Sequence, residues 1–211
     1  MGNFSLKFDK FWETFIKYNG YVKVLEGLKN TLTIAVLGLI IGIVIGTLIA
    51  TARVIPQYKV LPRILNKICS FYVALFRGTP IVVQLLVFYY VLLPLMGSRM
   101  TGIQVAVMVF GLNSAAYISE IMRGGIMSVD SGQMEAGRAV GLSFGTTMLK
   151  IVIPQAVKNI LPTMGNELIA LIKDTSVVSF VGATDLYVAF SFIGSSNYEF
   201  MVPYLVMALI Y

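Results

Sequence analysis

Residues 130–154 read DSGQMEAGRAVGLSFGTTMLKIVIP, a polar stretch with spaced glycines inside an otherwise apolar chain. Asp130, followed three residues later by Gln133, is typical of a helix that starts with a capping box. Gly141 is suited to end that helix in a left-handed conformation, and a second helix is then expected to begin near Ser143. The stretch therefore predicts a helical hairpin between two membrane-like segments.

The first helix of this hairpin is expected to present a thin surface. Its small residues would let a partner's cleft come close, while the charged side chains of Glu135 and Arg138 would fix the partner's orientation. The small residues are Ala136, Gly137, Ala139 and Gly141. Spacing alone leaves two interpretations open, a solvated connection between spans and a docking element.

Composition places the chain in a membrane. Hydrophobic residues make up 57% of the 211 residues, charged residues only 12%, and the mean hydropathy is +0.84. Soluble domains carry about 25% charged residues. No ordinary globular core explains this excess, so we expect an all-α integral membrane protein.

Long charge-free windows locate the expected spans. Residues 30–52, 78–98 and 100–119 each have the roughly 20 residues that a helix needs to cross a hydrocarbon core of about 30 Å. A fourth candidate near 159–181 is interrupted by Glu167, Lys173 and Asp174. A fifth begins near Phe200 and reaches only Tyr211, about half the length of a span. We expect five spans, at about 28–53, 70–96, 101–122, 157–181 and 200–211, with the last one clipped at its C-terminal end.

The basic residues sort by side of the membrane rather than forming a patch for nucleic acid. Two connections are rich in them, the first with Arg53, Lys59, Arg63 and Lys67, the third with Arg123, Arg138, Lys150 and Lys158. The opposite connections hold Arg99, Asp185 and Glu199. The positive-inside rule makes the first and third connections cytoplasmic and puts the N-terminus outside. Five N-terminal lysines argue the other way, partly offset by three acids, and we let the internal loops decide.

Metal and thiol chemistry find little support in the composition. The single Cys69 cannot build an internal disulfide framework, and the chain has no histidine, the commonest metal ligand and general base. We expect neither a metal nor a cofactor.

The N-terminal residues 1–24 are expected to form an amphipathic helix. Phe4, Phe8, Phe11, Trp12 and Phe15 fall on one helical stripe, and the lysines fall elsewhere. Aromatic rings favour headgroup depth while lysines reach water, so this helix is expected to lie against membrane lipid. A helix that binds a protein partner is the alternative.

Two features of the first two spans concern packing. Gly38, Gly42, Gly46 and Ala50 recur every fourth position, a ridge that lets another helix approach closely. Pro80 has no N–H and disfavours a helical Thr79, so the helix should kink or break in the segment FRGTP. Backbone groups freed at that depth must line a polar cavity or be buried in protein. Arg77 reaching the cytoplasmic headgroups is an adequate structural explanation of this segment.

Polar residues inside the later spans are candidates for a transport path. Asn113, Tyr117 and Glu120 share one helical face, and Glu167 and Asp174 share another. Ionisable residues within a span cost several kcal/mol unless they meet partners or water. A structural salt bridge, such as Glu120 with Lys173, is the alternative, but three acids outnumber one lysine.

Several of these segments together are similar to one family. Glu135-Ala136-Gly137, three residues, Gly141, nine residues and Ile151-Val152-Ile153-Pro154 resemble the "EAA" loop of ABC importer permeases, with Gly137 and Ile153 in place of Ala and Leu. FRGTP, LNSAAYISEIMRGGI, IVIPQAVKNILPTMGNELIALIKDTS and VGATDL resemble the permease subunit of polar amino-acid importers of the histidine, glutamine and arginine type. The resemblance covers residues 25–211.

This resemblance implies a type I importer-like five-span permease core in the plasma membrane of a prokaryote. It implies a second permease copy or a sister permease, a dimer of ATP-binding cassette ATPases and an extracytoplasmic solute-binding protein. Glu135, Ala136, Gly137, Arg138 and Gly141 would belong to the coupling helix that docks on the ATPase. The permease itself would not be an enzyme, since the chain has no GxxxxGK[ST] phosphate-binding loop.

The substrate path is expected to use polar residues from three spans. An amino-acid zwitterion needs an acceptor for its ammonium group and a donor for its carboxylate. The excess of acid over base in this set indicates a cationic side chain on the substrate. The expected residues are Thr79, Gln84, Asn113, Tyr117, Glu120, Glu167, Lys173 and Asp174.

Two other classes of function compete with this interpretation. An ion-coupled amino-acid carrier or channel would use the intramembrane acids for cations, but it leaves the 130–154 loop unexplained. An intramembrane protease with a pair of aspartates would need Asp174 and Asp185, and neither lies in a GxGD context.

Overall fold

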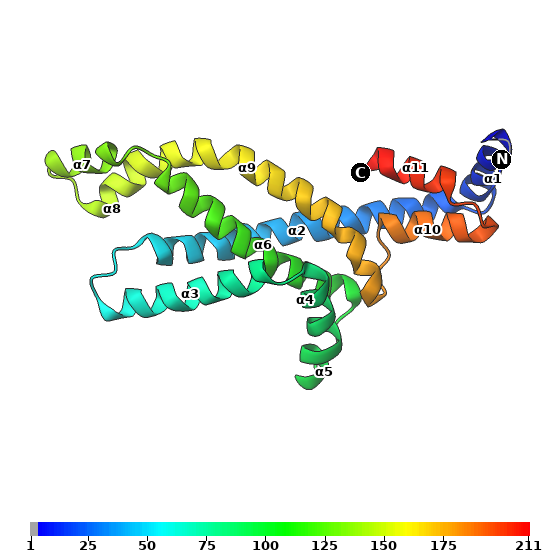
Figure 1. Ribbon diagram of the computed structural model, residues 1–211, viewed down its shortest axis with the longest axis horizontal. Helices are drawn as coiled ribbons and strands as arrows, with labels where there is room; N and C mark the ends of the chain where they lie inside the picture. Colours follow the sequence, from blue (N-terminus) through cyan, green and yellow to red (C-terminus); the bar gives the residue numbers. More distant parts are fainter. Residues whose placement is uncertain (1–3) are drawn as a thin grey trace. The chain divides into compact units, whose positions relative to one another are not determined.

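The computed structural model describes residues 4–211, and every regular element in that range is helical (Figure 1). The α-helices are α1 Phe4–Trp12, α2 Gly20–Val54, α3 Val60–Gly78, α4 Ile81–Val87, α5 Leu93–Leu95, α6 Gly102–Met127, α7 Ser131–Ala139, α8 Phe144–Thr147, α9 Ile153–Asp174, α10 Leu186–Asn197 and α11 Met201–Ile210. Three π-helical stretches, Glu13–Lys17, Phe88–Leu92 and Met148–Val152, follow α1, α4 and α8, and the 3-10 helix Thr175–Val181 follows α9.

The chain forms two compact units. The first contains Met1–Leu37 as far as it is described, Ile81–Val109 and Leu171–Tyr211, and the second contains Gly38–Pro80 and Phe110–Ala170. Helices α2, α6 and α9 each contribute to both units.

Two helices are long and apolar enough to cross a membrane on their own, α2 with 35 residues and α6 with 26. Two broken pairs pass the same test when each pair is taken as one span, α3 with α4–α5 and the helix Phe144–Val181 with α10. The short α11 is also apolar. The helix in the second expected span begins at Val60, ten residues before the expected start. The count of five spans and the outside N-terminus stay predictions.

The glycine ridge of α2 packs against α6 in the second unit. A Cβ added at Gly42 would lie 2.7 Å from Ser114 Oγ, and one at Gly46 would lie 3.0 Å from Ile118 Cβ. In return, α6 offers Gly111 to the side chain of Ile41. Since close approach takes the place of a hydrophobic driving force in lipid, the expected packing role of this ridge is confirmed.

The break expected at Pro80 is present. Helix α3 ends at Gly78, Thr79 is extended with φ −121° and ψ 144°, and α4 begins at Ile81. The extended residue before proline is what the steric clash with the proline ring demands.

The N-terminal helix does not stand alone, because α1 packs on α10 and α11 in the first unit (Figure 1). Phe11 is buried in a cluster with Val24, Leu186, Phe190 and Val202, and Lys7 forms an ion pair with Glu199 at 3.2 Å. The other side of α1 stays exposed and carries Phe4, Phe8 and Trp12. One half of the aromatic stripe therefore belongs to the core of this unit, while the other half is free to meet lipid.

Helix α10 was not expected from the sequence. Asp185 caps it by accepting a hydrogen bond from Val188 N at 2.9 Å, and Asn30 donates to Thr184 O at 2.8 Å. Gly27 of α2 lies so close to the Asp185 carbonyl that a Cβ there would overlap it. These contacts hold the start of α10 against α2.

Candidate substrate path and coupling hairpin

The hairpin of residues 130–154 forms as expected, with α7 and α8 beside each other (Figure 1). Asp130 Oδ1 accepts a hydrogen bond from Gly132 N at 2.8 Å at the start of α7. At its end, Gly141 has φ +86°, Leu142 N donates to Gly137 O and Gly141 N donates to Arg138 O, both at 3.0 Å. This pair of bonds is a Schellman motif, in which glycine takes the left-handed position without a Cβ clash.

The second helix also starts where expected, since Ser143 Oγ accepts from Thr146 N at 3.2 Å. In a complete capping box, the Gln133 side chain would accept a hydrogen bond from Asp130 N. The Gln133 side chain accepts instead from Gln155 Nε2 at 3.3 Å and so links α7 to α9. That contact depends on how the hairpin folds back, which local sequence does not reveal.

The packing around Gly137 explains why glycine stands here in place of the second alanine of the EAA pattern. Gly137 is buried against Thr147, whose side chain is completely buried. A Cβ at Gly137 would lie 2.8 Å from Thr147 Oγ1 and closer still to its Cγ2 methyl group. The β-branched threonine thus occupies the space that an alanine methyl would need.

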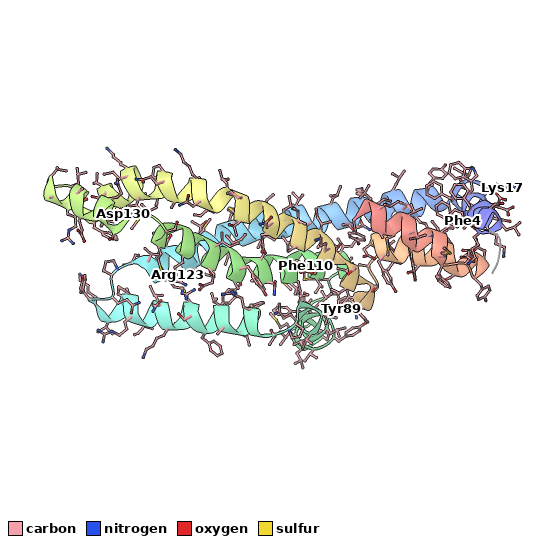
Figure 2. The ribbon with its side chains drawn as sticks, turned by 45° about the horizontal axis from the view of Figure 1, so that its top comes forward. Phe4, Lys17, Tyr89, Phe110, Arg123 and Asp130 are labelled. Atoms are coloured by element: carbon pink, nitrogen blue, oxygen red, sulfur yellow. The ribbon has the colours of Figure 1, made fainter. Side chains whose placement is uncertain are left out.

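The outer surface of the hairpin is open. Glu135, Ala136 and Arg138 are exposed, and neither charged residue takes part in an ion pair within residues 4–211. Val140 is 76% exposed and Leu149 67% exposed. Figure 2 shows Asp130 at the start of α7 and Arg123 on α6. Apolar side chains flanked by charges are suited to a protein partner.

The helix break at Pro80 gives two of the expected path residues structural contacts. In an unbroken helix Phe76 O would accept from the N–H of residue 80, which proline lacks. Asn113 Nδ2 donates to this carbonyl at 3.3 Å, and Thr79 Oγ1 donates to Leu75 O at 2.8 Å. Backbone freed at the break is therefore paired within the protein.

Glu120 is held by two arginines of the second unit. Arg53 of α2 forms an ion pair with Glu120 Oε1, and Arg123 donates to Glu120 Oε2 at 2.8 Å. The expected comparison of three acids with Lys173 alone omitted these two cations. That count was wrong, because Glu120 already has two positive partners. Glu120 also lines an open cavity of about 430 Å³ with Ser128 and Asn159.

The remaining expected residues are divided between the units. In the second unit, Glu167 accepts from Ser114 Oγ at 3.0 Å, and the ring of Tyr117 lies under the Arg77 guanidinium at 5.3 Å. In the first unit, Gln84 is buried, while Lys173 and Asp174 are exposed. The structure thus places five of the eight residues in one unit and three in the other.

Sequence reasoning missed the contacts of two arginines. Arg53 was counted only for topology, but folding brings it from α2 to Glu120 of α6. Glu120 also pairs with Arg123, three residues later on its own helix. Arg77 was explained by the headgroups, yet it contacts the aromatic face of Tyr117. Its position two residues before a Thr-Pro break was the signal available in the sequence.

Comparison with known families supports this architecture. Residues 38–211 match the model of the family described as the inner membrane component of binding-protein-dependent transport systems. The chain belongs to this family and is the permease subunit of an amino-acid ABC transporter, a helical protein of the prokaryotic inner membrane.

Two curated relatives cover most of the chain. The arginine transport system permease protein of Bacillus subtilis is 39% identical over 188 residues, which are 89% of this chain and 84% of the relative. The putative glutamine transport system permease protein of Rickettsia bellii is 37% identical over 201 residues, 95% of this chain and 90% of the relative.

Solved structures agree. The crystal structure of an amino acid ABC transporter with histidines has a TM-score of 0.84 and 36% identity, covering 94% of this chain and 89% of the solved one. An inward-facing methionine ABC transporter matches with 19% identity and a TM-score of 0.70 over 89% of this chain and 88% of the solved one. This match shows the shared type I importer fold.

Proposed function

We propose that this permease moves a polar amino acid into the cytoplasm by alternating access, driven by ATPase subunits that dock on the 130–154 hairpin. The observation that carries the proposal is the exposed α7 surface with its Schellman turn at Gly141. A surface that ends in a fixed turn can transmit movement of a docked partner to α9, because the second helix of the hairpin continues into α9.

The permease contributes no catalytic group to ATP hydrolysis in this proposal. Two ATPase subunits would clamp the α7 helices of two permeases, either two copies of this chain or this chain and a sister. Closure of the ATPases would switch the spans from inward-open to outward-open, and a solute-binding protein would deliver the amino acid from outside. Ligand-dependent populations of two states are enough to describe this cycle.

Docking can be tested by cross-linking from the exposed end of α7. In a Cys69→Ser background, Val140→Cys should cross-link to the co-expressed ATPase, because Val140 lies at the tip of the hairpin and is 76% exposed. Tyr58→Cys is the matched control, since Tyr58 is 91% exposed in the other connection that we expect to be cytoplasmic. Equal labelling of the two sites, or cross-linking from Tyr58 alone, would contradict docking on the hairpin.

The substrate is proposed to be a polar amino acid, supported by the names of the arginine and glutamine relatives. We keep the eight path residues as proposed contacts, with Asn113 and Glu120 acting mainly through the groups that they already hold. The proposed preference for a cationic side chain now rests on Glu167, because Arg53 and Arg123 already hold Glu120 and the charge of Asp174 is offset in the count by Lys173. Charge interactions are strong in a low-dielectric site, so one acid placed near the side chain of the substrate can select.

Replacing Glu167 with Gln tests that preference. The change keeps an acceptor for Ser114 Oγ while removing the charge. Uptake of arginine should fall far more than uptake of glutamine when one solute-binding protein delivers both. Equal losses would assign Glu167 to the common ammonium group or to the fold, and the cationic preference would be withdrawn.

A further inference from the structure

Arg77 lies too deep along α3 to be explained by the headgroups. It follows Lys67 by ten residues, which is about 15 Å along an α-helix. With Arg63 and Lys67 at the predicted cytoplasmic surface, this distance is half of a hydrocarbon core of about 30 Å. An arginine side chain cannot return over that distance, so its charge stays at mid-membrane depth.

The Arg77 guanidinium has an aromatic neighbour but no counter-ion in residues 4–211. The ion pairs found there involve Lys7, Lys17, Arg53 and Arg123. Arg77 is exposed, and its guanidinium carbon lies 5.3 Å from the centre of the Tyr117 ring. Stacking on an aromatic face orients the planar guanidinium and leaves its N–H groups able to donate at the edge.

The space beside Arg77 is open at the helix break. A Cβ added at the next residue, Gly78, would meet nothing within 4 Å, and Thr79 is exposed. On neighbouring helices of the second unit, Glu120 is held by two arginines and Glu167 accepts a hydrogen bond from Ser114, and Arg77 forms an ion pair with neither acid. An always-charged group at this depth costs several kcal/mol against hydrocarbon, so Arg77 needs polar surroundings and an anion that its own unit does not pair with it.

We infer that Arg77 binds the α-carboxylate of the transported amino acid. A guanidinium forms two parallel hydrogen bonds to a carboxylate, which recognises the one group that every amino acid carries. Arg77 then distinguishes amino acids from the corresponding amines, while the side chain of the substrate is selected elsewhere. This inference rests on the amino-acid import proposed above and adds the residue that defines the substrate class.

The test compares amino acids with their decarboxylated forms. The purified permease–ATPase complex in lipid nanodiscs is titrated, without a solute-binding protein, with L-arginine and agmatine and with L-glutamine and 4-aminobutanamide. Saturation-transfer NMR suits the weak affinities of a transport site. In the unchanged complex the amino acid should bind more tightly than its amine in at least one pair.

Arg77→Gln should weaken binding of that amino acid by about tenfold or more, the usual effect of losing a hydrogen-bonded charge pair. The amine should bind as before, within about twofold of its original affinity. Arg63→Gln, on the same helix near the cytoplasmic surface, is the matched control and should change neither. Arg77→Lys keeps the charge but loses the planar fork, so it should give an intermediate loss confined to the amino acid.

Parallel losses for the amino acid and its amine would overturn the inference, because they indicate a structural role or a lipid phosphate as the anion. Unchanged binding of the amino acid in Arg77→Gln would overturn it as well. If Arg77→Gln does not assemble, Arg77→Lys decides by the same comparison. ATP-driven uptake of amino acids by the unchanged transporter is measured first, and its absence would sink the proposed function instead.

Discussion

The contact between Gly137 and Thr147 allows a test of the 130–154 hairpin in which a methyl group is moved from one residue to the other. In Gly137→Ala, the new methyl group would lie 2.8 Å from Thr147 Oγ1 and closer to its Cγ2 atom. Overpacking of this kind costs about 1–3 kcal/mol. Alanine recovers about 1 kcal/mol of helix propensity relative to glycine. The net expectation is a destabilisation of α7 against α8 by about 1 kcal/mol, which is a factor of about 5 in a local opening equilibrium.

The compensating change is Thr147→Ser, which deletes the clashing methyl group and keeps the hydroxyl that donates to Ser143 O at 3.0 Å. Alone it should cost about 0.5–1.5 kcal/mol, as for other single buried methyl groups. Combined with Gly137→Ala, it moves one methyl group from residue 147 to residue 137. The hydroxyl oxygen that stays at residue 147 would still lie 2.8 Å from the new methyl group, so the double variant should recover only part of the lost local stability, with a coupling energy of about 1 kcal/mol between the sites.

Hydrogen exchange of the α7 amides in the reconstituted transporter measures this difference. Exchange should be about fivefold faster in Gly137→Ala and slow down toward the original rate in the double variant. Transport should follow the same order if the hairpin transmits force. A double variant that exchanges as fast as Gly137→Ala would refute the reasoning, because the threonine methyl would then not be the reason for glycine at this position.

Three further predictions concern the turn, the helix break and the N-terminal helix. Gly141→Val puts a β-branched residue at φ +86° and should abolish transport while membrane insertion persists. Gly145→Ala is the control and should be harmless, because the space around Gly145 is open. Normal uptake by Gly141→Val would contradict the account. Asn113→Leu removes the donor to Phe76 O and should lower stability by about 1–3 kcal/mol, seen as earlier thermal inactivation; an unchanged inactivation temperature would show that the bond is dispensable. Trp12 is the chain's only tryptophan and is half-exposed. Lipids brominated near the headgroup should quench its fluorescence more than lipids brominated near the end of the acyl chain, with Trp12→Phe as the background. Quenching by aqueous iodide alone would rule out lipid contact.

Signals that act over a few residues predicted the structure well. Pro80 ended a helix because it lacks an N–H, Gly141 took the left-handed turn because it lacks a Cβ, and Ser143 began a helix by accepting a hydrogen bond. The glycine ridge of α2 likewise found a closely packed neighbour. In each case, the physical cause lies within the local backbone or on one helix face.

Features that depend on distant partners could not be predicted in this way. Glu120 is neutralised by Arg53 from a helix 67 positions earlier, and α1 buries Phe11 against helices at the other end of the chain. Helix α10 was overlooked because its 12 residues are too few for a span, although Asp185 before an apolar run is a helix-start signal. The path residues remain the least determined from sequence, since a polar group within a span can serve either the fold or the substrate.

Reconstituted uptake tests the central claim most directly. The permease, its ATPase and its solute-binding protein are placed in liposomes, and accumulation of labelled arginine or glutamine is followed with ATP on the cytoplasmic side of the transporter. The account predicts accumulation that requires ATP and the binding protein and persists when ionophores remove all ion gradients. Uptake that proceeds without ATP and collapses with an ion gradient would contradict it and favour an ion-coupled carrier.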